Sequence, residues 1–184
     1  MQAMNLFMLV IGGKPLGRFT EQHDVFFGIA EELKDLVPSL HKFWPALEGK
    51  MHIDSWREVS QVEGFQIKVV PRDSNPLKGE NKLFFVNLGG YKPNDMEEYH
   101  YKQVVVATDL AEATRLAKQS VFWKHHDSSH IDDKYGIDVD DIYEVEDLLD
   151  SDSKSKFQLH CVEGEGQEDE LHVGYLKISK LLAQ

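Results

Sequence analysis

Residues 81–90 read NKLFFVNLGG, and an earlier stretch, residues 5–13, reads NLFMLVIGG. Both are apolar runs that begin near a Leu-Phe pair and end on a Gly-Gly pair. A continuous apolar run that stops abruptly is typical of a strand that is buried on both faces. The same kind of segment therefore occurs twice, and we expect each copy to be a central strand of a sheet.

Further matches follow at nearly the same spacing. With the Gly-Gly pairs aligned, the second copy lies 77 residues after the first (89 − 12). The other shared markers are Glu21 with Glu98, His23 with His100, and, after one slipped residue, His52-Ile53-Asp54 with His130-Ile131-Asp132. Self-similarity at this scale indicates a duplicated supersecondary unit. We expect strand-strand-helix-strand repeats over residues 4–75 and 81–150, packed about a pseudo-twofold axis.

In the first repeat, residues 24–29 are apolar and aromatic and predict a second strand. Residues 30–44 have apolar residues at helical spacing, interrupted by Pro38. Proline inside a helix removes a hydrogen bond, so we expect either a kink or a short turn followed by a helix with Pro38 in its first turn. Alternation over residues 65–69 predicts a half-buried strand.

In the second repeat, three consecutive valines within residues 101–107 predict another strand. Thr108-Asp109 offers an N-cap for a helix running to about Trp123. Its predicted buried stripe consists of Leu110, Ala113, Ala117 and Val121. Residues 124–141 are interpreted as a long polar insertion, and residues 142–145 as a short strand.

The last segment has no counterpart in the first repeat. Apolar residues alternate in two short runs around Leu159 and Val173, separated by a glycine-rich acidic stretch. This pattern predicts a C-terminal β-hairpin over residues 155–178. The fold class is therefore α+β, with residues 1–184 forming one globular unit from two repeats and the hairpin.

Composition restricts the possible partners. The net charge is −12, with 41% hydrophobic residues. A surface this acidic repels phosphate backbones and anionic lipid, so we expect no nucleic-acid and no membrane partner. The single cysteine, Cys161, permits no internal disulfide and no cysteine-based zinc motif, which fits a reducing, cytoplasmic location. Continuous apolar strands and many aromatic residues favour a homo-oligomer.

One repeated polar set is the candidate site: Glu21, His23, His52 and Asp54 in the first repeat, and Glu98, His100, His130 and Asp132 in the second. Because a strand and the helix that follows it run in opposite directions, the two segments of each set can meet in space. Imidazole and carboxylate groups together suit zinc, manganese or ferrous iron, a small polar ligand, or general acid–base chemistry. The competing interpretation is structural, with each histidine bound to a nearby carboxylate or backbone group. Spacing alone does not assign a particular metal or cofactor.

Two other patterns point less clearly to chemistry. The Gly-Gly pairs follow strands but lack the spacing of a phosphate loop, and no helix opens after them, so we expect tight turns with positive φ. The acidic residues 138–152 do not match the calcium-loop pattern and are interpreted as a solvated face.

Several motifs occur together in order: LFMLVIGG, LFFVNLGG, EQHDVFFGIAEEL, MHIDSW and EGFQIKVVP. Because of these motifs and their order, the chain resembles a bacterial family catalogued as domain of unknown function 1543. The resemblance extends over about residues 4–150. The resemblance implies a duplicated α+β unit in a bacterial cytoplasmic protein, and it implies no activity, substrate or catalytic residue.

Two functions remain open. The first is a non-enzymatic binding or assembly protein. The alternative is a small enzyme or metal-binding protein that uses the repeated His/Asp/Glu set. The choice depends on whether the histidines and carboxylates of each set converge.

Overall fold

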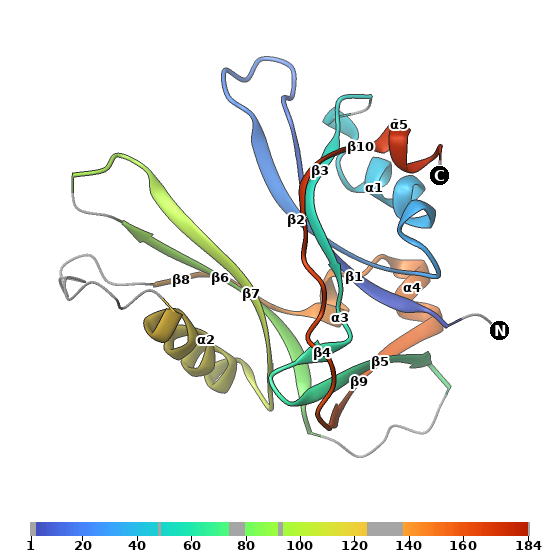
Figure 1. Cartoon of the computed structure of the whole chain (residues 1–184), viewed down its shortest axis with the longest axis vertical. Helices are drawn as coiled ribbons and strands as arrows, with labels where there is room; N and C mark the ends of the chain where they lie inside the picture. The colour runs from blue at the N-terminus through green and yellow to red at the C-terminus, as the bar shows by residue number, and fades with distance from the viewer. Residues whose placement is uncertain (1–2, 48, 74–79, 92–93, 125–137, 184) are drawn as a thin grey trace. The chain divides into compact units, whose positions relative to one another are not determined.

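The computed structural model describes residues 3–47, 49–73, 80–91, 94–124 and 138–183 (Figure 1). The chain divides into two compact units. Unit 1 consists of Met1–Asn75 and Leu148–Gln184, and unit 2 of Pro76–Asp147. Helices and several antiparallel sheets occur together, which confirms the α+β class. The prediction of one globular unit with a pseudo-twofold axis stays a prediction.

The main sheet of unit 1 has four strands in the order β10-β3-β1-β2. Its members are β1 (Asn5–Gly13), β2 (Gln22–Ala30), β3 (His52–Glu58) and β10 (His172–Lys177), and every neighbouring pair is antiparallel. The apolar run of β1 lies between β2 and β3, as expected of a buried central strand. The pairing of β1 with β3 contains a bulge between Val10 and Ile11.

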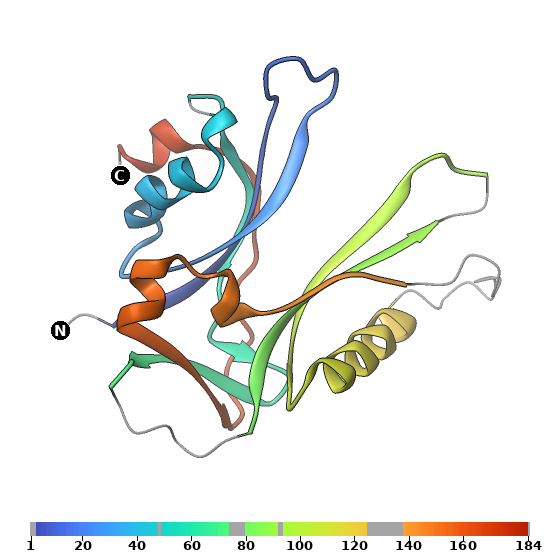
Figure 2. The ribbon, with the colours of Figure 1, turned by 180° about the vertical axis from the view of Figure 1, so that it is seen from behind.

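Short helices cover one face of this sheet (Figure 2). They are η1 (Leu33–Leu36), α1 (Val37–Phe43), η2 (Pro45–Leu47) and α5 (Ile178–Leu181). Pro38 lies in the first turn of α1, where proline loses no helical hydrogen bond. This confirms the second of the two expectations for that segment. Leu40, Leu47 and Ile11 are among the fully buried residues of the resulting core.

A smaller sheet in unit 1 has the strand order β4-β5-β9. It contains β4 (Gln61–Val62), β5 (Phe65–Pro71) and β9 (Phe157–Glu163), and α4 (Ser151–Lys156) leads into β9. The predicted C-terminal hairpin is wrong, because β9 pairs with β5 whereas β10 pairs with β3. Both runs are strands, but the segment between them crosses from one sheet to the other.

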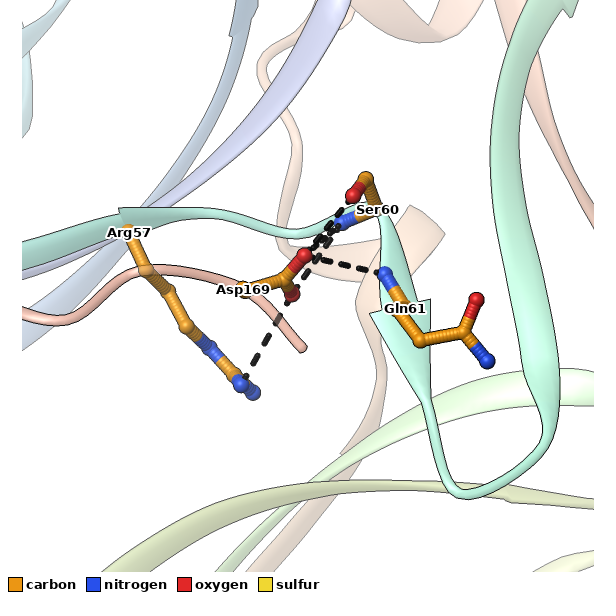
Figure 3. A network of polar contacts seen from close by, with 4 residues as sticks. All are labelled: Arg57, Ser60, Gln61 and Asp169. Carbon is orange, nitrogen blue, oxygen red and sulfur yellow. Dashed lines mark hydrogen bonds and ion pairs between the residues drawn. The ribbon is translucent and has the colours of Figure 1, made fainter. Parts of the chain in front are cut away.

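Asp169 anchors this crossing segment (Figure 3). Its side chain is 2% exposed. Its carboxylate accepts hydrogen bonds from the backbone N–H groups of Ser60 and Gln61 at 3.1 Å and from the Ser60 hydroxyl at 2.7 Å. Arg57 Nη1 lies 3.8 Å from Asp169 Oδ2; burial lowers the pKa of the Arg57 guanidinium, and the charge of Asp169 opposes that change. The anchor explains why the glycine-rich segment does not close a hairpin.

Unit 2 has one sheet, in the order β7-β6-β8, with a helix on one face (Figures 1 and 2). Its elements are β6 (Lys82–Tyr91), β7 (Glu98–Ala107), α2 (Leu110–Lys124) and β8 (Asp138–Glu144), followed by α3 (Val145–Leu148). Asp109 Oδ1 accepts a hydrogen bond from the Glu112 N–H at 2.8 Å, which confirms the predicted helix start. Ala113 and Ala117 are buried as expected, but Leu110 is 52% exposed and does not belong to the stripe.

The strand β8 begins earlier than expected. Residues 138–141 were interpreted as part of a polar insertion, but they are the first part of β8, paired with β6. The β6–β8 pairing has a bulge between Asn87 and Leu88. Alternating Asp and aliphatic residues give this strand one polar face, which hid its strand character. None of the helices in these described ranges is long and apolar enough to cross a membrane.

Candidate metal centre

The Gly-Gly pair of β1 lies inside the strand, not in a turn. Gly12 pairs with His23 and Gly13 with Gln22, and neither glycine has a positive φ. The expectation of tight turns with positive φ is therefore wrong. Because successive side-chain positions of a strand point to opposite faces of the sheet, Gly12 and Gly13 leave space on opposite faces. A Cβ atom on Gly13 would lie 2.9 Å from the Leu47 side chain, on the helix-covered face.

Gly12 instead makes room for the predicted polar set on the other face. A Cβ atom there would lie 2.7 Å from His23 Cδ2, and 2.8 Å from both His52 Nε2 and Asp54 Oδ2. Three side chains thus occupy the space above one glycine. The register of β1 with β2 and β3 brings together the two segments of the first repeat that hold the candidate site residues.

The four side chains Glu21, His23, His52 and Asp54 form what we call the unit 1 cluster. His52 Nε2 lies 2.8 Å from Glu21 Oε1 and 3.2 Å from Asp54 Oδ1, and His23 Nε2 lies 3.3 Å from Asp54 Oδ2. The donor atoms of Glu21, His23 and His52 all lie within 4.8 Å of one another. Two imidazole nitrogens and the Glu21 carboxylate are therefore mutually close, and each oxygen of the Asp54 carboxylate lies beside one of the two imidazoles.

Asp54 reaches this point because of the β-bulge. Val10 pairs with Ser55 and Ile11 with Ile53, so Asp54 is the extra residue of β3. A bulge of this kind redirects a side chain and is common beside functional sites. Asp54 Oδ2 is buried and accepts no hydrogen bond from any described residue, although His23 Nε2 is near. Buried side-chain oxygens in folded proteins nearly always have a bonding partner, so this oxygen is free to contact a bound group.

His52 is the most enclosed member of the cluster, with its side chain 6% exposed. The ring of Tyr175, on β10, packs against the His52 ring with a centroid distance of 4.4 Å. Glu21 and His23 are each close to half exposed. One side of the unit 1 cluster is therefore covered by β10, and the side formed by Glu21 and His23 is open to solvent.

The distances within the unit 1 cluster fit ligands around one metal ion. Tetrahedral ligands at about 2.0–2.2 Å from zinc lie roughly 3.3–3.6 Å apart. Octahedral neighbours at about 2.1 Å lie roughly 3.0 Å apart. The observed 2.8–3.3 Å separations fall close to both ranges. Imidazole and carboxylate ligands suit zinc, manganese and ferrous iron.

Unit 2 brings together a related but different set. His100 pairs with Gly89, and His100 Nε2 lies 3.2 Å from Asp140 Oδ2 and 3.8 Å from Glu98 Oε2. Asp140 is the extra residue of the β6–β8 bulge, since Asn87 pairs with Asp141 and Leu88 with Val139. A Cβ atom on Gly89 would overlap the Asp140 carboxylate. The negative charge of Glu98 raises the pKa of the Tyr91 phenol, with smaller contributions from burial and from the hydrogen bond between them.

His130 and Asp132 lie outside the described residues. Asp140, which the sequence analysis did not include, contacts His100. The signal was present: Asp138-Val139-Asp140 repeats the polar-aliphatic-Asp pattern of His52-Ile53-Asp54.

Comparison with known proteins supports the family resemblance and supplies no activity. A solved structure, described as a protein Il1583 from Idiomarina loihiensis, is 24% identical with a TM-score of 0.60, and the match covers 94% of this chain and 96% of that chain. This similarity shows a shared fold. No curated protein matches the sequence. Residues 18–69, which hold all four members of the unit 1 cluster, match the model of the family described as Domain of Unknown Function (DUF1543).

Proposed function

We propose that this chain is a metal-binding protein whose unit 1 cluster holds a divalent transition-metal ion. The observation that carries the proposal is the convergence of His23, His52 and two carboxylates above Gly12. Of the functions left open by the sequence, this is the alternative in which the His/Asp/Glu set acts as a ligand site.

The competing structural account requires that both imidazoles carry a proton on the nitrogen that faces the carboxylates. Glu21 and Asp54 both approach His52 Nε2, a single nitrogen that carries at most one proton. That proton cannot also serve Asp54 Oδ2, which is buried, so the structural account needs a second proton on His23 Nε2, 3.3 Å from that oxygen. A divalent cation at the centre would compensate both carboxylates at once and use both imidazoles as ligands.

The unit 1 cluster is also buried on one side and open to solvent on the other, as a site that binds a ligand requires. His52 is buried under Tyr175, which favours a fixed imidazole orientation. The exposed side allows water or a small polar ligand to occupy remaining coordination positions, as in metal sites that bind substrate. An enzymatic role therefore stays an extension of the metal-binding proposal.

We extend the proposal to the origin of the fold: unit 2 and the β1–β3 part of unit 1 are copies of one strand-strand-helix-strand unit. The support comes from the positions of the two β-bulges and from the strand pairing. The two bulges begin at Val10 and Asn87, which are 77 residues apart (87 − 10), the same offset as the Gly-Gly pairs. In both, the third strand pairs with the first.

The test is calorimetric titration of the chelator-stripped full chain with Zn²⁺, together with thermal unfolding. We expect saturable binding of one ion to the unit 1 cluster and a rise in melting temperature. An ion at 100 times its dissociation constant stabilises the folded state by about 2.7 kcal/mol. His52→Ala and Asp54→Asn should each lower Zn²⁺ affinity by at least about tenfold.

Asp24→Asn is the matched control, because Asp24 is an exposed acidic neighbour of His23 outside the cluster and the change removes the same charge. It should leave Zn²⁺ affinity unchanged. If His52→Ala lowers the melting temperature but the Zn²⁺-induced shift stays that of the unaltered chain, the histidines are structural and the proposal is wrong.

A further inference from the structure

We infer that unit 2 carries a second cation site, formed by Glu98, His100 and Asp140, which prefers a harder divalent ion such as Mn²⁺ and holds it more weakly than unit 1 holds its metal. This inference goes beyond the proposed function, since the two sites lie in separate units and neither contributes a ligand to the other.

The backbone places these three side chains on one face of the sheet. Glu98 and His100 are two residues apart on β7 and therefore point to the same side. His100 pairs with Gly89, and Asp140 is the bulge residue of β8 on the far side of that glycine. Leu88, the neighbour of Gly89, belongs to the core under α2, so the cluster lies on the face opposite the helix.

The donor atoms of the three side chains are close enough together to contact one ion. His100 Nε2 lies 3.2 Å from Asp140 Oδ2 and 3.8 Å from Glu98 Oε2, and all three donors lie within 4.8 Å of one another. Octahedral ligands at about 2.1 Å lie roughly 3.0 Å apart when adjacent and roughly 4.2 Å apart when opposite. The three side chains can thus fill part of an octahedron, with water at the other positions.

The ligand atoms of the unit 2 cluster include a larger share of carboxylate oxygen than those of the unit 1 cluster. Unit 2 offers one imidazole and two carboxylates, whereas unit 1 offers two imidazoles and two carboxylates. With one nitrogen ligand fewer, the carboxylates make up a larger share of the donor set, which shifts preference from Zn²⁺ towards Mn²⁺ and other hard ions. All three ligands are also exposed, so water competes more strongly for the ion.

The two clusters also differ in how far the protein covers them, and this difference too predicts weaker binding in unit 2. In unit 1 the strand β10 pairs with β3 and places Tyr175 over His52. In the described part of unit 2, β8 is an edge strand and pairs with β6 alone. An uncovered site exchanges its ion readily, which is why we expect lower affinity.

The experiment is a Mn²⁺ titration of the chelator-stripped full chain, following the paramagnetic resonance signal of free aqueous Mn²⁺, which weakens on binding. The titration is repeated on a chain whose unit 1 cluster is disabled by His52→Ala with Asp54→Asn. We expect one saturable Mn²⁺ site to remain in that background. This separates failure of the second site from failure of the proposed function.

Asp140→Asn and His100→Ala should each weaken the remaining site by at least about tenfold. Asp141→Asn is the matched control: it removes the same charge one residue away, where Asp141 accepts a hydrogen bond from Asn87 at 3.1 Å. If Asp141→Asn weakens Mn²⁺ binding as much as Asp140→Asn, the ion is attracted by a diffuse acidic surface. That result, or no saturable binding in the disabled background, overturns the inference.

Discussion

Gly12 is the residue on which the unit 1 cluster depends most directly. Its missing side chain leaves space for His23, His52 and Asp54, each of which approaches within 2.8 Å of where a Cβ atom would stand. Gly12→Ala should therefore displace the ligands and lower Zn²⁺ affinity by at least about tenfold. Zn²⁺ titration of the variant tests this directly.

Gly13→Ala supplies the contrast, since its Cβ atom would meet Leu47 in the core, 2.9 Å away. Overpacking of a well-filled core destabilises by about 1–3 kcal/mol. Gly13→Ala should lower the melting temperature while keeping Zn²⁺ affinity close to that of the unaltered chain. Equal loss of Zn²⁺ affinity in both variants would contradict the assignment of the two glycines to opposite faces.

The sequence predicted the members of the unit 1 cluster and missed one residue of the unit 2 cluster. Glu21, His23, His52 and Asp54 were expected together and do converge. Asp140 was missed because a bulge, and not the spacing of letters, decides which residue of a strand approaches the glycine. Register depends on long-range pairing, which a local motif does not encode.

At the scale of elements, β10 depends on the anchor made by Asp169. The carboxylate is 2% exposed and accepts hydrogen bonds from two backbone N–H groups and one hydroxyl. Hydrogen bonds to charged groups contribute about 1.5–3 kcal/mol each, and their loss leaves buried donors unpaired. Asp169→Ala should lower the free energy of unfolding by about 2–4 kcal/mol, measured by urea denaturation.

The control for Asp169 is Asp152→Ala. Asp152 forms an exposed ion pair with Lys156 at 2.7 Å on α4. Such i,i+4 pairs contribute about 0.3–0.5 kcal/mol. If the two alanine variants unfold at the same urea concentration, Asp169 does not hold the crossing segment in place.

The start of α2 gives a pH-dependent prediction. The Glu112 carboxylate accepts hydrogen bonds from the Thr108 N–H at 2.9 Å and the Thr108 hydroxyl at 2.8 Å, and the backbone bond is the main cause that lowers the pKa of Glu112. Because the folded pKa lies below its ordinary value, this stabilisation is present above that value and is lost as pH falls through the folded pKa. Glu112→Gln should melt earlier than the unaltered chain at pH 7, with the difference vanishing in acid.

Thermal unfolding over a pH series provides the measurement, with Glu80→Gln as an exposed control in the same unit. A difference between the Glu112 variant and the unaltered chain that persists unchanged below the ordinary pKa of 4.5 would contradict the cap assignment.

Local sequence patterns predicted several strands and a helix, but not which strands pair with one another. Apolar runs predicted β1 and β6, and capping residues predicted α2. Alternation also marked β9 and β10 as strands, but their partners lie about a hundred residues earlier in β5 and β3. The hairpin prediction failed because alternation identifies a strand's faces and not its neighbour, and because Asp169 directs the connecting segment elsewhere.

At the scale of the whole molecule, the expectation of a homo-oligomer stays a prediction. Three apolar residues on alternate positions at the β10 edge, Leu171, Val173 and Tyr175, are 67%, 81% and 63% exposed. An exposed apolar edge strand favours pairing between copies. We expect an oligomeric mass by light scattering at micromolar concentration, reduced by Val173→Lys. A monomeric mass of the unaltered chain across pH 6–8 would rule the oligomer out.

Anomalous scattering from crystals of the full chain grown with Zn²⁺ would locate directly the ion that we propose for the two histidines and two carboxylates of unit 1. We expect an anomalous peak at the zinc edge about 2.0–2.1 Å from the Nε2 atoms of both His23 and His52, with carboxylate oxygen from Glu21 or Asp54 at about 2.0–2.2 Å. Crystals that contain Zn²⁺ but show no peak between these side chains would contradict the proposal.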